Sequence, residues 1–241
     1  YTLALFLFHT LQEEREAMRR FTQNSLLDGL IVTADNAEDP FVPTLIKRGM
    51  PFVYVGRPLD PDHVTFVDVD NVVGAYNATT HLIKRGYKRI AQISTAHNTA
   101  GLDRDQGYRQ ALTDRGIELD ENLIVYGDFS ERSGYEAMQC LLRYKPDAVF
   151  IQSDSMAVGA CQAIRQAGLH VPHDIAVVGF DDLPPAMQTP VPLTTVRQPI
   201  QRTGMIAVET LIDLLRNPEQ PPQHIILPTE LVIRSSCGTI N

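Results

Sequence analysis

The sequence has no long apolar run and little cysteine. No stretch of its 241 residues approaches the roughly 18 consecutive apolar residues that a membrane helix requires. Residues 1–8 lack the basic flank and cleavage site of a secretory signal. The three cysteines, Cys140, Cys161 and Cys237, are far apart and form no CxxC or Cys/His cluster. Because free thiols suit a reducing compartment, we expect a cytoplasmic protein.

Basic residues are also in deficit. The chain has 21 Lys and Arg against 29 Asp and Glu, which gives a formal net charge of -8. DNA binding depends on Lys and Arg meeting phosphates, so this balance opposes direct DNA contact. If the protein binds DNA, we expect another segment to do so.

Catalytic and metal-binding motifs are missing. The sequence contains no nucleophile elbow and no phosphate-binding loop. Of its seven histidines, His9, His97 and His170 lie singly, without metal-ligand spacing. We therefore expect no metal, no cofactor and no enzyme activity. One catalytic alternative stays open, in which Asp154 and Asp181 act as paired carboxylates in acid/base hydrolysis.

What the chain does contain is a regular alternation of short apolar runs and amphipathic stretches, about 25 residues apart, as βα units require. Several of the runs are apolar without alternation, which is typical of parallel strands covered on both faces. We expect strands at 3–8, 29–33, 52–55, 64–67, 90–93, 123–126, 148–151, 175–179 and 225–233. Nine strands exceed what one open sheet of this size usually carries, which favours two α/β lobes with a ligand cleft between them.

Two helices have clear boundaries in the sequence. Asp70 and Asn71 can cap a helix that ends at Gly86. Pro199 can open a later helix that stops at 217–218, where Asn and Pro follow each other.

A series of phrases resembles the effector-binding core of the LacI/GalR repressors. They run in the family's order from residue 66 to residue 238 and read VDVDNVVGAYNATTHLIKRGYKRIAQIS, RDQGYRQAL, GDFSERSGYEAM, SDSMAVGACQAIRQAGLHVPHDIAVVGFDD, PLTTVRQP and LPTELVIRSSCG. The earlier phrases YTLALF, LLDGLIVT and GMPFVYVGRP resemble the family's second, third and fourth strands more loosely. Order and spacing together are far more specific than any single motif.

The resemblance implies a periplasmic-binding-protein-like type I fold, α/β, with two lobes, each a parallel sheet with helices on both faces, and three crossovers. The N-terminal lobe would comprise 1–68 plus 199–224, and the C-terminal lobe 69–198 plus 225–241. The family's first strand and helix, and the helix-turn-helix upstream of them, are not in this sequence. We therefore expect the native protein to begin before Tyr1.

Ligand-binding residues are expected beyond the carboxyl ends of the strands, where open α/β sheets bind ligands. The family resemblance selects the same region. It places a ligand-binding arginine at Arg104, whose fork could hold two oxygens, a carboxylate at Asp181 and an aromatic face at Phe129. Each residue also has a plainer structural alternative. Arg104 could pair at the surface with a neighbouring aspartate, Asp181 could cap a loop, and Phe129 could pack in the core.

Other expected contacts are less typical of the family. Ser153 stands where the family usually carries asparagine, next to the candidate Asp154. A hydroxyl offers fewer donors than an amide, which favours a ligand different from that of close relatives. In the first lobe Gly56 replaces a common aspartate, which leaves Arg57 and Asp35 as candidates.

The function that the resemblance implies is allosteric sensing. A sugar or similar small metabolite would bind between the lobes and change a homodimer whose upstream heads bind operator DNA. The implied dimer face includes Met156, an exposed Val158, Leu183 and Met187. A periplasmic sugar-binding transport receptor with the same fold is the alternative.

Overall fold

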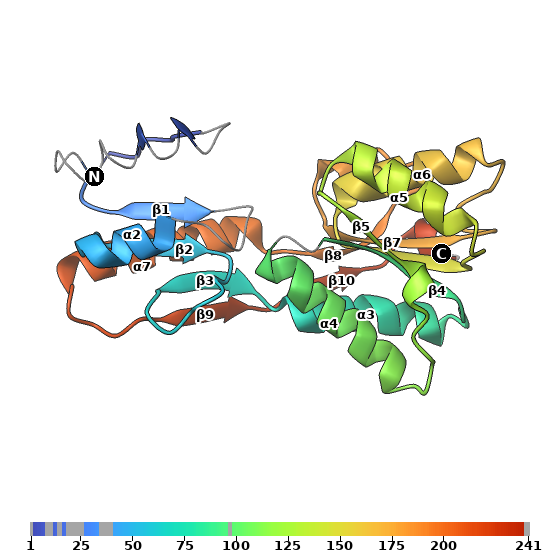
Figure 1. The fold of residues 1–241 in the computed structure, drawn as a ribbon, viewed down its shortest axis with the longest axis horizontal. Helices are drawn as coiled ribbons and strands as arrows, with labels where there is room; N and C mark the ends of the chain where they lie inside the picture. The colour runs from blue at the N-terminus through green and yellow to red at the C-terminus, as the bar shows by residue number, and fades with distance from the viewer. Residues whose placement is uncertain are drawn as a thin grey trace.

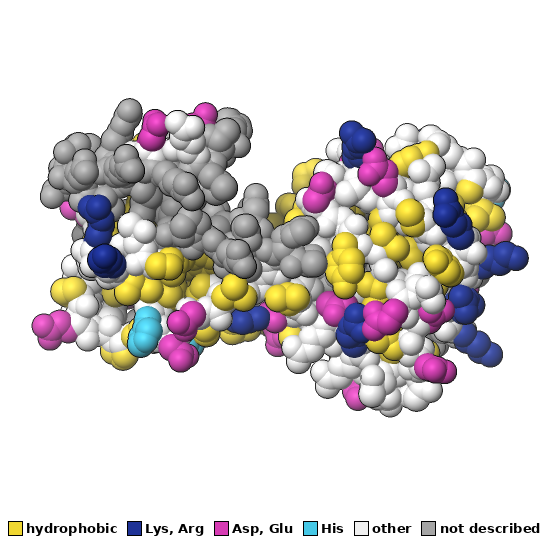
Figure 2. Space-filling model, in the orientation of Figure 1, with side chains coloured by type: hydrophobic (Ala, Val, Ile, Leu, Met, Phe, Trp, Pro, Cys, Tyr) yellow, Lys and Arg dark blue, Asp and Glu magenta, His cyan; other side chains and the backbone are white. Residues whose placement is uncertain are grey.

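The computed structural model describes residues 2–7, 12–13, 16–17, 27–33, 41–95 and 98–238. Figure 1 shows two α/β lobes side by side, and Figure 2 shows that they meet at a narrower waist. The expected two-lobed fold is confirmed. No helix in these ranges is long and apolar enough to cross a membrane.

The first lobe has a four-stranded sheet in the order β1-β2-β3-β9, with every pair parallel. Its strands are β1 (Leu30–Thr33), β2 (Phe52–Val55), β3 (Phe66–Val69) and β9 (His224–Leu227). Helix α2 (Phe41–Arg48) buries Leu45 against one face, and α7 (Ile200–Arg216) buries Ala207 against the other.

The second lobe has a six-stranded sheet in the order β10-β8-β7-β6-β4-β5, parallel except for β10. Its strands are β4 (Ile90–Thr95), β5 (Ile124–Gly127), β6 (Ala148–Ile151), β7 (Ala176–Asp181), β8 (Thr194–Arg197) and β10 (Glu230–Val232). Helices α3 (Asn71–Lys84) and α4 (Thr99–Thr113) cover one face, and α5 (Glu131–Leu142) and α6 (Asp154–Gln166) cover the other. Short 3-10 turns lie at Glu121–Leu123, Pro184–Met187 and Ser235–Cys237.

The chain passes between the lobes three times, from β3 to α3, from β8 to α7 and from β9 to β10. The two predicted helices form α3 and α7. Asp70 caps α3 as expected, because its Oδ1 accepts a hydrogen bond from the Val73 amide at 2.9 Å.

Two strand predictions are wrong. Residues 2–7 form no strand, although they are apolar, because apolar composition alone does not make a strand, which also needs a hydrogen-bonded neighbouring strand. The single strand expected at 225–233 is divided at Pro228 into β9 and β10, which belong to different sheets. Residues 225–227 thus pair with β3 in the first lobe, although the sequence predicted that this part of the first lobe ends at residue 224.

Candidate functional site

The candidate site lies at the carboxyl edge of the six-stranded sheet, on the side of the first lobe. Strand β4 has β5 on one side and β6 on the other, so the strand order reverses there. Ligands bind beside such a reversal in open α/β sheets. Arg104 comes from the first turns of α4, Phe129 follows β5, Ser153 follows β6 and Asp181 ends β7.

Arg104 is buried rather than at the surface, with only 4% of the residue exposed. Its Nε donates to Asn71 Oδ1 at 2.8 Å, and its Nη1 donates to the Gln152 carbonyl at 2.5 Å. The guanidinium carbon lies 3.6 Å from the centre of the Phe180 ring. Burial lowers the pKa of Arg104, while the charge of Asp181 acts against that shift.

Asp181 faces this guanidinium. Its Oδ1 lies 3.7 Å from Arg104 Nη1 and accepts a hydrogen bond from Gln198 Nε2 at 2.7 Å. Burial raises the pKa of Asp181, and Arg104 lowers it. The backbone of Asp181 has a φ of 120°, which a residue with a side chain rarely adopts. Such strain is typical of functional positions, where surrounding contacts hold it in place.

Asp182 has a different role from Asp181. It accepts from Arg197 Nε at 2.7 Å and from Arg234 Nη2 at 2.6 Å. These ion pairs lower the pKa of Asp182 against the opposing effect of burial. Asp182 therefore joins the loop after β7 to β8 and to the segment that follows β10.

Three buried polar residues of the cluster were not predicted from the sequence as residues of the site. Gln152, fully buried after β6, accepts from the Thr95 amide at 2.9 Å and donates to Ser94 Oγ at 3.1 Å. Asn71 Nδ2 donates to both carboxylate oxygens of Asp68, at 3.3 and 3.4 Å. Burial raises the pKa of Asp68. The available signal was polar residues directly after apolar strands, in VDVDN and FIQSD.

Ser153 and Asp154 are both buried at the start of α6. Ser153 Oγ caps the helix by accepting from the Met156 amide at 3.4 Å. Asp154 accepts from Thr195 Oγ1 at 2.7 Å and from the Leu183 amide at 3.1 Å. Burial raises the pKa of Asp154 to about 7. Their contact with a ligand stays a prediction, and these bonds give Asp154 a positioning role between β8 and the loop after β7.

Phe129 is half-buried and has a φ of 68°, so it too is held in the left-handed region. Its predicted contact with a ligand stays a prediction. In the first lobe, Arg57 forms an ion pair with Asp103 of α4 at 2.5 Å. The other first-lobe candidate, Asp35, lies outside the described residues.

Of the expected dimer residues, Met156 is a correction. It belongs to the first turn of α6 and is fully buried in the core, so it has no surface to offer a partner. Val158 is half-buried rather than exposed. Leu183 is 40% exposed and Met187 is 64% exposed, so both are accessible, and their role in a dimer stays a prediction.

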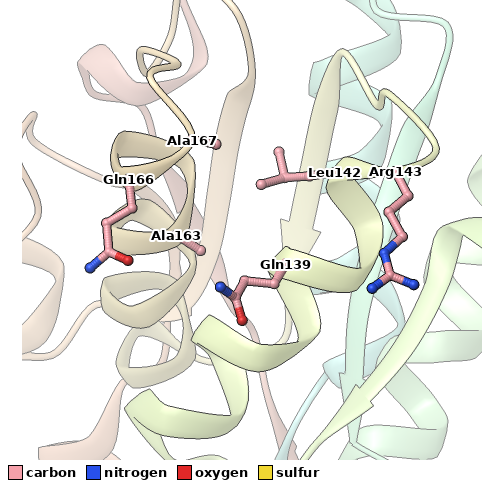
Figure 3. Close-up of a pocket in the computed structure, with 6 residues that line it drawn as sticks. All are labelled: Gln139, Leu142, Arg143, Ala163, Gln166 and Ala167. Atoms are coloured by element: carbon pink, nitrogen blue, oxygen red, sulfur yellow. The ribbon is translucent and has the colours of Figure 1, made fainter.

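A separate depression lies between α5 and α6 on the outer face of the second lobe (Figure 3). It is lined by Gln139, Leu142, Arg143, Ala163, Gln166 and Ala167. These residues belong to or follow the last turns of the two helices, which lie at the amino edge of the parallel strands. The depression is therefore at the opposite edge of the sheet from Arg104 and Asp181. Among the described residues, no group of three or more His, Cys, Asp or Glu side chains could hold a metal ion.

Comparison with known proteins identifies the family. Residues 79–237 match the periplasmic binding protein-like domain. The HTH-type transcriptional regulator CelR of Thermobifida fusca is 39% identical over 228 residues, covering 92% of this chain and 67% of CelR. The chain thus spans about two thirds of the length of that relative.

Solved structures agree with this. A CelR-cellobiose complex has a TM-score of 0.91 and 38% identity, covering 94% of this chain and 71% of the other. A LacI family regulator from Enterococcus faecium with bound ribose has a TM-score of 0.84 and 26% identity, covering 92% of this chain and 83% of the other. The resemblance seen in the sequence is confirmed, and the chain belongs to the LacI family of transcriptional regulators, whose periplasmic-binding-protein-like sensing fold it carries.

Proposed function

We propose that this chain senses a sugar or similar small metabolite that binds between the lobes, against Arg104 and Asp181. The supporting observation is their placement together, with a buried Arg104 3.7 Å from a partly buried Asp181, beside the reversal of strand order. The pairing of the Arg104 guanidinium with the Asp181 carboxylate leaves little net charge on the pair, and it offers both donors and acceptors to hydroxyl groups. The bound cellobiose and ribose of two structural relatives support a neutral sugar.

The remaining functional steps follow from the family. We propose that the chain acts in the cytoplasm as a homodimer, with Leu183 and Met187 in the dimer face, and that ligand binding changes the affinity of an attached domain for operator DNA. We propose the lobe division 1–68 plus 199–224 and 69–198 plus 225–241, within which residues 225–227 pair with β3 of the first lobe.

The two alternatives have less support. A periplasmic transport receptor shares the fold, but the relatives matched along most of the chain are transcriptional regulators. Hydrolysis by Asp154 and Asp181 would need both carboxylates free to act, whereas both oxygens of Asp154 accept hydrogen bonds from Thr195 and Leu183. The relatives are regulators and not enzymes.

A thermal shift screen tests the proposal. The chain is heated with cellobiose, ribose, other neutral sugars, sugar phosphates and nucleosides. A ligand at 100 times its dissociation constant adds roughly 2.7 kcal/mol of stability. We expect a neutral sugar to raise the melting temperature, and Arg104→Ala to weaken its binding roughly 10- to 100-fold, since bonds to a charged group are lost.

Arg109→Ala is the matched control, because Arg109 lies on the same helix and binds Asp105 and Glu121 away from the cluster. Each variant is compared with its own ligand-free melting temperature, which separates loss of binding from loss of stability. Equal binding by the wild type and by Arg104→Ala would contradict the assigned site.

A further inference from the structure

Arg57 was expected to contact ligand, but the structure gives it another partner. It follows β2 in the first lobe, whereas Asp103 belongs to α4 in the second lobe. Arg57 Nη2 donates to Asp103 Oδ1 at 2.5 Å, and Arg57 Nε donates to Asp103 Oδ2 at 3.2 Å. The guanidinium thus binds the carboxylate through two parallel hydrogen bonds, which is the strongest and most directional form of such a pair.

A third hydrogen bond joins the same two segments. The Thr99 hydroxyl, on the first residue of α4, donates to the main-chain carbonyl of Arg57. Thr99 is buried, and the Arg57 and Asp103 side chains are 31% and 17% exposed. The pair is therefore partly shielded from water, and it is screened less than the fully exposed pairs that contribute little.

The backbone on both sides fixes this contact. Gly56 has a φ of 104°, a conformation that favours glycine, and it turns the chain directly before Arg57. On the other side, a Cβ at Gly101 would lie 1.9 Å from the Thr95 carbonyl oxygen, so only glycine lets the first turn of α4 pack against the end of β4. Asp103 is thus carried by a helix turn packed against β4, and Arg57 directly follows the turn at Gly56.

The same turn of α4 also carries Arg104. Asp103 binds the first lobe, and the next residue, Arg104, binds Asn71 and Gln152 within the second lobe. A shift of this turn that moves one residue must move the other, because they are adjacent in a helix.

From this geometry we infer that Arg57, Asp103 and Thr99 form an interlobe latch that holds the two lobes together and positions the turn of α4 bearing Arg104. Arg57 acts in it as a positioning residue and not as a ligand contact. A ligand that binds between the lobes requires them to be close. The latch therefore sets the fraction of molecules that are in the conformation able to bind ligand. The latch rests on the proposed function but does not depend on which effector binds, so the latch proposal can be wrong while the proposed function is correct.

The test measures the distance between the lobes without ligand. Nitroxide labels are placed at Asp62→Cys and Glu118→Cys in a Cys140→Ser background, because the other two cysteines are buried. Double electron–electron resonance then gives the distribution of distances between the two labels, and from it the ratio of open to closed populations. We expect Arg57→Ala and Asp103→Ala each to raise this ratio roughly twofold to fivefold, the range for a partly exposed ion pair.

The double variant distinguishes a latch from two separate effects. We expect Arg57→Ala with Asp103→Ala to open the lobes no more than either change alone, because both remove the same contact. The charge-swapped pair Arg57→Asp with Asp103→Arg should recover part of the closed population that each swapped single variant loses. Circular dichroism confirms that each variant is folded.

The matched control is the pair Asp105 and Arg109 on the same helix, joined at 2.7 Å with side chains 21% and 30% exposed. Removing it should leave the open-to-closed ratio unchanged, because both residues belong to the second lobe. An unchanged ratio in Arg57→Ala and Asp103→Ala, or additive effects in their double variant, would overturn the latch.

Discussion

At the scale of single residues, the site contains three carboxyl groups whose pKa values are raised by burial. Burial raises the pKa of Asp68 and of Asp181, and it raises that of Asp154 to about 7. A group whose pKa is higher in the folded than in the unfolded protein takes up its proton more readily when folded. Its contribution to stability is therefore complete at low pH and is lost as the pH rises through the folded pKa.

This gives a prediction for Asp154. The pKa of Asp154 is near 3.8 in the unfolded chain and about 7 in the folded protein. The free energy of unfolding should therefore fall as the pH rises from the first value to the second. In Asp154→Asn the amide can still accept from the Leu183 amide and donate to Thr195 Oγ1, so the fall should become shallower and the variant should be more stable than the wild type at pH 8. Urea unfolding at pH 5, 6, 7 and 8 measures this. A wild-type slope retained in Asp154→Asn would contradict it.

At the scale of elements, the start of α4 is the most constrained helix end at the site. Gly101→Ala should destabilise the protein by about 1–3 kcal/mol, the usual cost of overpacking, because its Cβ meets the Thr95 carbonyl. Gly204→Ala in α7 is the control, since nothing lies within 4 Å of a Cβ there. The control should stabilise by about 0.5–1 kcal/mol, because alanine favours a helix. Thermal unfolding of both variants decides this, and equal melting temperatures would contradict the packing argument.

The elements also show what sequence can predict. Apolar runs gave the buried strands β2, β4 and β6 within two residues, because burial on both faces leaves a continuous apolar run. Strand β8 was not predicted as a strand, because its sequence TTVR has little apolar character and its threonines are buried through hydrogen bonds. Arg104 and Asp181 followed from strand ends and family resemblance. Asp68 and Asn71 could not be predicted as site residues in this way, because their role depends on contact with Arg104, which is distant in the sequence.

At the scale of the whole molecule, two lobes built from interleaved parts of one chain are joined by three crossovers (Figure 1). The Arg57–Asp103 ion pair joins the two lobes, and the Arg104–Asp181 pair lies at the carboxyl edge of the six-stranded sheet. Such an arrangement lets one ligand contact both lobes, so that its binding free energy favours one relative placement of the lobes over another. This is the physical basis for sensing that we propose for this member of the LacI family.

The most direct test of this account is a crystal structure of the chain with the neutral sugar that gives the largest thermal shift. We predict that the sugar lies between the lobes, with its hydroxyl groups within hydrogen-bond distance of Arg104 and Asp181. A sugar bound elsewhere, for example in the depression between α5 and α6 at the opposite edge of the sheet (Figure 3), would contradict the assigned site.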